Sequence, residues 1–61
     1  MSPDTPIDDP AITFSQPFVR AMLAAGITTL GAAWARSDAE LLALHGVGKR
    51  GVRMLRELQS G

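Results

Sequence analysis

The sequence contains no cysteine, no tyrosine, one tryptophan and one histidine in 61 residues. The absence of cysteine excludes disulfide bonds and thiolate metal sites, and with them the small secreted proteins that disulfides hold together. One histidine among scattered carboxylates makes no cluster with the spacing of metal ligands. We therefore expect neither a metal nor another cofactor.

Long apolar runs are also missing. None approaches the roughly 20 residues that span a bilayer, so no membrane contact is expected. The first ten residues, MSPDTPIDDP, are acidic and rich in proline, which is the opposite of a signal peptide. These features predict a cytoplasmic protein.

A catalytic set of side chains cannot be assembled from this composition. There is no cysteine to pair with the one histidine, and the serines and threonines lie where helix caps are expected. A domain of this length also has little room for a deep pocket. The sequence therefore predicts a protein that is not an enzyme and has no small-molecule substrate.

Apolar residues make up 46% of the chain, which is enough for the core of one small domain. Residues 1–13 are predicted to form an acidic, proline-rich flexible tail, and residues 14–61 the folded domain. Within the tail, the residues that break helices or favour solvent are Pro3, Pro6, Pro10, Asp4, Asp8 and Asp9. Ile7, Ile12 and Phe14 are the apolar exceptions, and these three have a reason to pack onto the domain.

The domain is predicted to be all-α, a compact bundle of four to five short helices. The first helix covers residues 16–25, starts at the N-cap Ser15 and ends at Gly26. The second begins after its cap Thr28 and stops near Arg36. Their buried faces are formed by Phe18, Ala21, Met22 and Ala25, and by Leu30, Ala33 and Trp34. No run alternates with a period of two over the length of a strand, so no sheet is expected.

The stretch from Ser37 to Glu40 matches a capping box and predicts the start of a third helix. This helix is expected to turn Leu41, Leu42 and Leu44 inward and to end at His45-Gly46. A last helix is expected from Gly48 to about Gln59, with Val52, Leu55 and Leu58 on one face.

The segment Gly46-Val47-Gly48 connects these last two helices. Its glycines are expected to supply the positive φ angles of a tight reversal, and Val47 to point into the core. The amides of Gly48, Lys49 and Arg50 would then face outward, unsatisfied, at a helix N-terminus. Such amides form an anion site, and phosphate suits it because no closed pocket is indicated.

The charges are distributed unevenly along the chain. Residues 1–40 carry five acidic and two basic residues, whereas residues 41–61 carry four basic residues and one acidic residue. The net charge of zero therefore does not exclude one basic face, and Lys49, Arg50 and Arg53 are the basic residues nearest the glycines.

The stretch LLALHGVGKRGVRMLREL, residues 41–58, resembles a helix-hairpin-helix motif. Its Gly-apolar-Gly segment, the small residue Gly51 and the apolar positions of the second helix all fit that family. From Phe14 to Leu58 the chain is similar to the C-terminal domain of the bacterial RNA polymerase α subunit and its small stand-alone bacterial relatives. The resemblance implies a SAM-like fold and contact with the DNA backbone that is largely independent of base sequence.

Residue by residue, the resemblance implies a nucleic-acid site made of Gly46, Val47, Gly48, Lys49, Arg50, Arg53 and Arg20. The family's minor-groove arginine falls on Pro17, which departs from the pattern, and Arg20 takes the place of a nearby asparagine contact. Little base specificity is therefore expected, because phosphate contacts position a protein without reading sequence.

Two functions remain open. The first is a small DNA-binding module that contacts double-stranded DNA. The alternative is a protein–protein interaction domain, associated with transcription or DNA-repair machinery, in which the glycines form only a tight connection and the basic residues only a solvated helix face.

Overall fold

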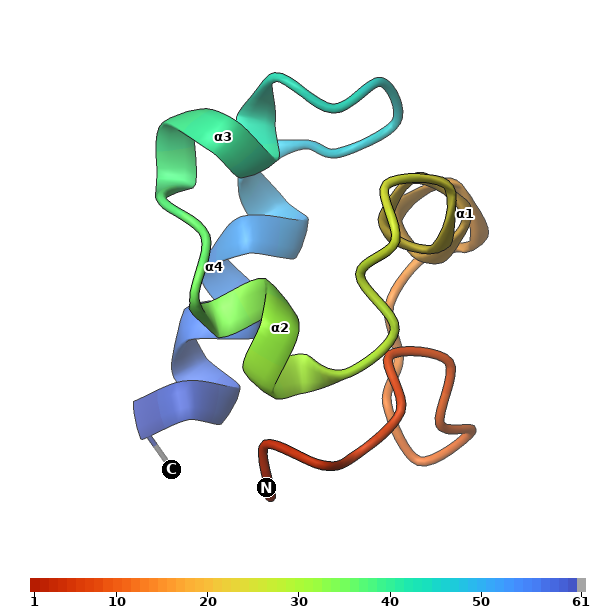
Figure 1. Cartoon of the computed structure of the whole chain (residues 1–61), viewed down its shortest axis with the longest axis vertical. Helices are drawn as coiled ribbons and strands as arrows, with labels where there is room; N and C mark the ends of the chain where they lie inside the picture. The colour runs from red at the N-terminus through yellow and green to blue at the C-terminus, as the bar shows by residue number, and fades with distance from the viewer. Residues whose placement is uncertain (61) are drawn as a thin grey trace.

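Residues 1–60 are described by a computed structural model and form four helices without a strand (Figure 1). The helices are α1 (Gln16–Ala24), α2 (Leu30–Trp34), α3 (Asp38–Leu42) and α4 (Lys49–Ser60). The all-α class is thus confirmed. None of the helices in this part of the chain has the length and apolar character needed to cross a membrane.

The short helices α2 and α3 both pack against the long helix α4, while α1 lies on the other side of the molecule (Figure 1). Ten hydrophobic residues form the core between them. They are Ile7, Phe18, Met22, Ile27, Leu30, Ala33, Leu41, Val47, Val52 and Leu55. The predicted inner faces of the first and last helices are confirmed, with Ala21, Ala25 and Leu58 packed at the margin.

The N-terminal segment differs from the expected flexible tail, because Ile7 is fully buried in the core. Its N–H donates to the Thr28 carbonyl at 2.9 Å, and the Leu30 N–H donates to the Thr5 carbonyl at 2.9 Å. The prolines do not prevent this docking, since the donors come from other residues. Their fixed φ angles also reduce the entropy that the segment loses on ordering.

Helix α1 has both predicted caps. The Ser15 hydroxyl accepts from the Phe18 N–H, and Gly26 has a φ of 80°. The Ile27 N–H donates to the Met22 carbonyl at 2.8 Å, and the Gly26 N–H donates to the Leu23 carbonyl at 3.0 Å. This pair of bonds is a Schellman motif, closed by the apolar contact that Ile27 was expected to supply.

Helix α2 starts one residue later than predicted, because its cap is Thr29 and not Thr28. The Thr29 hydroxyl accepts from the Ala32 N–H at 3.2 Å. Thr28 is held by the docked N-terminal segment, which uses its carbonyl as an acceptor for Ile7. A long-range contact therefore decides between two equally suitable capping residues.

Helix α3 has the predicted capping box but ends at Leu42, earlier than the expected end at His45-Gly46. Of the three leucines expected to point inward, Leu41 is buried and Leu44 is half-buried, but Leu42 is 40% exposed. The expectation for Leu42 is wrong because successive helical residues lie about 100° apart, so the neighbour of Leu41 turns away from α4.

Candidate nucleic-acid interface

The connection between α3 and α4 reverses the chain at Gly46. The Val47 N–H donates to the Leu44 carbonyl at 3.1 Å, which places Gly46 at the third position of a four-residue turn with a φ of 97°. A Cβ on Gly46 would also lie 3.0 Å from the Pro17 carbonyl oxygen. Val47 is buried, as expected, and anchors the turn to the core. Glycine is thus required here by backbone conformation and by packing.

Gly48 is different, and the expectation that it also supplies a positive φ is wrong. Among residues 1–60, only Gly26 and Gly46 have positive φ. A Cβ built on Gly48 would meet no atom within 4 Å. Nothing inside the described chain requires a glycine at this position, so its missing side chain leaves the backbone open to solvent.

The start of α4 has no capping side chain. The first three helices each have a serine or threonine hydroxyl that accepts from a first-turn amide. At α4, within the described chain, the amides of Gly48, Lys49 and Arg50 donate no hydrogen bond. These free donors lie at the positive end of a 12-residue helix.

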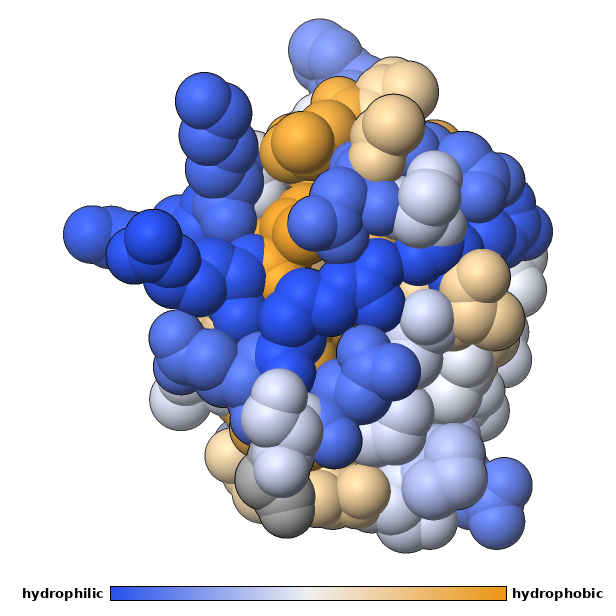
Figure 2. Space-filling view, turned by 90° about the vertical axis from the view of Figure 1, so that its left-hand side faces the viewer, coloured by the Kyte–Doolittle hydropathy of each residue, from blue (hydrophilic) through white to orange (hydrophobic). Residues whose placement is uncertain are grey.

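Three basic side chains stand beside these amides. Lys49, Arg50 and Arg53 are exposed and together line a surface hollow of about 330 Å³. None of them forms an ion pair with another of the described residues. The space-filling view shows a strongly hydrophilic face with apolar side chains between its polar groups (Figure 2). The structure thus brings together the residues that the sequence suggested from Gly46 to Arg53.

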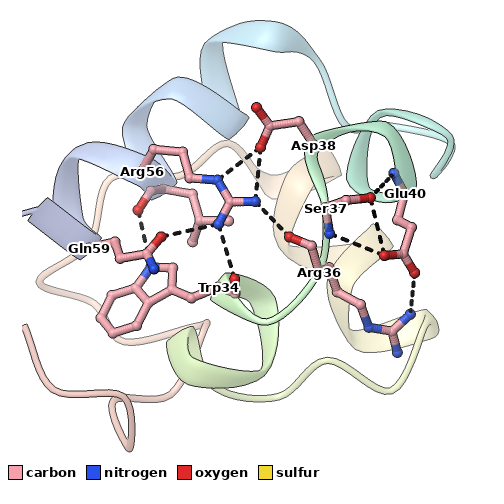
Figure 3. Close-up of polar contacts among 8 residues, drawn as sticks. Trp34, Arg36, Ser37, Asp38, Glu40, Arg56 and Gln59 are labelled. Atoms are coloured by element: carbon pink, nitrogen blue, oxygen red, sulfur yellow. Dashed lines mark hydrogen bonds and ion pairs between the residues drawn. The ribbon is translucent and has the colours of Figure 1, made fainter.

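Arg56 lies on the same helix but has a structural role (Figure 3). Its guanidinium donates to the Trp34 carbonyl at 3.1 Å and to the Arg36 carbonyl at 2.6 Å. The same group pairs with the Asp38 carboxylate at 2.8 Å. Arg56 therefore ties α4 to the C-terminal end of α2 and to the start of α3, and its charge is already compensated.

The acidic residues near α3 are likewise engaged. Glu40 accepts from the Ser37 N–H and hydroxyl, both at 3.1 Å, and its other oxygen lies 3.8 Å from Arg36 (Figure 3). The hydrogen bond from the Ser37 backbone lowers the pKa of the Glu40 carboxyl most, followed by the Ser37 hydroxyl, and the charge of Arg36 lowers it further.

Arg20 does not line the surface hollow that Lys49, Arg50 and Arg53 form. It is exposed on α1 and lines a different hollow, of about 360 Å³, together with Asp8 and Asp9. The structure therefore separates Arg20 from the other suggested residues. Over residues 1–60, no three histidine, cysteine or acidic side chains lie close enough to hold a metal ion.

Residues near the start of α1 also lie beside the hairpin. From the sequence, Phe14 favoured the protein-interaction alternative, but neither Phe14 nor Ser15 was expected beside the glycines. Phe14 and Ser15 line one hollow with Gly46, Gly48 and Arg50. They are more than 30 positions away in the chain. No spacing rule links them to the glycines, because tertiary packing, including that of Phe18 on Gly51, brings α1 to α4. A Cβ on Gly51 would clash with the Phe18 ring.

Comparisons with known proteins identify no relative: no family model, no curated protein and no solved structure matches the chain.

Proposed function

We propose that this protein is a small non-catalytic module that binds the phosphate backbone of double-stranded DNA, largely without reading base sequence. The observation that carries the proposal is the uncapped start of α4 at Gly48, with Lys49, Arg50 and Arg53 exposed beside it. Free amides at a helix start and nearby cations attract a phosphate through charge-assisted hydrogen bonds.

Duplex DNA fits this surface better than a small anion does. The three basic side chains and the hairpin amides line an open surface, and a backbone with repeated phosphates can contact several of these groups at once. With so few contacts, the dissociation constant is expected in the non-specific range of about 10⁻⁴ to 10⁻⁶ M. The affinity should fall as the salt concentration rises. The resemblance to helix-hairpin-helix proteins supports the same binding mode.

The decisive experiment compares two variants with the same change in net charge. Lys49→Gln combined with Arg50→Gln removes two charges at the hairpin, and Arg36→Glu changes the charge by the same amount near α3. Binding of a short random-sequence duplex is followed by amide NMR at several salt concentrations. We expect the hairpin variant to reduce the salt slope by about two and the Arg36 variant to change it little.

Equal losses in the two variants would mean that the duplex responds only to overall charge, and the hairpin proposal would be wrong. Unshifted amides in a well-dispersed spectrum would favour the second candidate, a protein-interaction domain. That candidate is supported by Leu42, which is 40% exposed and lines a hollow with Val52, Lys49 and Arg53. A protein partner would bury this leucine, whereas a phosphate backbone would not.

A further inference from the structure

A second hollow adjoins the hairpin, between the start of α1 and the start of α4. Its volume is about 360 Å³, and its lining includes Phe14, Met54, Gly48, Gly51 and Arg50. None of the residues that line it is acidic. Arg50 also lines the basic hollow with Lys49 and Arg53, so the two depressions meet at this side chain. One is charged, and the other is largely apolar.

The aromatic wall of this hollow is held in place. The Phe14 ring stacks on the Phe18 ring, with 4.3 Å between centroids and 24° between planes. Phe18 is only 2% exposed, and it is fixed against Gly51 on α4. Phe14 and Met54 are half-buried, and the Thr13 hydroxyl lies 3.8 Å from the Met54 sulfur. The apolar surface of the hollow therefore includes the Phe14 ring, which Phe18 supports, and the polarizable thioether of Met54.

We infer that this hollow receives an unpaired nucleobase from the strand whose phosphate lies at the start of α4, an inference that rests on the proposed function. A nucleobase has a flat apolar face and is linked through its sugar to a phosphate, which matches an aromatic hollow next to a phosphate site. Stacking of bases on aromatic side chains beside a basic groove is how single strands are commonly bound. Bases inside an intact duplex are already stacked and cannot enter.

The inference predicts a preference among DNA ends. Three ligands test it: a blunt duplex, the same duplex with a short single-stranded overhang, and the same overhang without bases. The last two carry the same phosphates, so they differ only in the bases. Overhangs are placed on either strand, and a mononucleotide tests whether a free base and phosphate suffice. We expect the overhang with bases to bind about fivefold or more tightly than the other two DNAs.

Methionine methyl NMR reports directly on the hollow. Met54 lines it, whereas Met22 is fully buried elsewhere in the core and serves as an internal control. A stacked base should shift the Met54 methyl signal through its ring current and leave the Met22 signal in place. Phe14→Leu keeps an apolar side chain but removes the ring, and should abolish the preference for bases, with thermal unfolding as the check on folding.

Equal affinity for the three DNAs with a stationary Met54 signal would overturn the base site. The proposed function would survive that result if the Lys49 and Arg50 amides still shifted with the blunt duplex. Loss of binding to all three ligands would overturn both. Should Phe14→Leu fail to fold, the comparison between overhangs with and without bases still decides, because it uses the unaltered protein.

Discussion

The starts of α3 and α4 are two helix N-termini on neighbouring segments of one small domain, and they differ in capping and in the sign of the nearby charge. At α3, Ser37 accepts from the Glu40 N–H while Glu40 accepts from the Ser37 N–H, so these two donors are satisfied and the nearby charge is negative. At α4, Gly48 offers no side chain and the charge is positive. The first arrangement stabilises the helix, and the second leaves its donors available.

The difference shows where the domain gives up local stability. A serine or threonine cap in place of glycine would add a few tenths of a kcal/mol to the stability of α4. Clustering Lys49 and Arg50 at the positive end of the helix dipole opposes the usual preference for acidic residues there. Both choices are unfavourable for the helix alone and favourable for an incoming anion.

The largest effect is expected from giving α4 the start that α3 has. Gly48→Asp supplies a capping carboxylate at a position where the added Cβ meets nothing. The variant should be as stable as the parent or slightly more so, yet its affinity for duplex DNA should fall by about tenfold or more, because the carboxylate occupies the amides and repels phosphate. Fluorescence anisotropy at low salt measures the affinity, and chemical denaturation the stability.

Gly48→Asn is the matched control, since it caps a helix about as well as aspartate but carries no charge. It should lose less affinity than Gly48→Asp. An aspartate variant that bound DNA like the parent would show that phosphate does not approach the start of α4.

A smaller effect is expected from removing the N-cap of α3. Ser37→Ala removes the cap of α3 and should lower the free energy of unfolding by about 1 kcal/mol. Urea denaturation measures this change. The affinity for DNA should stay at the parent value, because Ser37 caps α3 and the proposed DNA contacts lie at the start of α4. A loss of binding in a fully folded Ser37→Ala protein would contradict the proposal that the start of α3 serves stability and the start of α4 serves binding.

The smallest effect is a pH dependence confined to α3. In the folded protein the pKa of the Glu40 carboxyl lies below its ordinary value of 4.5. The ionised carboxylate therefore contributes fully to stability above pH 4.5, and this contribution is lost as the pH falls through the lower pKa of the folded state. The difference in stability between the parent and Glu40→Ala should therefore be smaller at about pH 3 than at about pH 7. An equal difference at the two pH values would show that the charge of Glu40 does not support the cap.

Features that depend on neighbouring residues could be predicted from the sequence. The capping box at Ser37 and the end of α1 at Gly26 require only local hydrogen bonds, and both are confirmed. The same holds for the buried face of α4, because Val52 and Leu55 repeat at helical spacing. Local spacing also identified the hairpin residues that line the basic hollow.

Features that depend on distant residues could not be predicted in this way. The choice of Thr29 as a cap depends on the N-terminal segment, and the structural role of Arg56 depends on carbonyls about 20 residues away. In the sequence Arg53 and Arg56 look alike as basic residues of one helix. Only the packing of α2 against α4 makes one of them a tie between helices and leaves the other exposed.

The burial of Ile7 has a consequence for the chain during its synthesis. Of the fully enclosed hydrophobic residues Ile7 comes first and Leu55 last, so the core cannot close until residues 7–55 have all left the ribosome. Until then Ile7 is an exposed isoleucine. It is flanked by Pro6, Asp8 and Asp9, residue types that act as gatekeepers against aggregation beside an apolar side chain. The residues that make this segment look unstructured are thus of the types that would limit aggregation of the nascent chain while its core is incomplete.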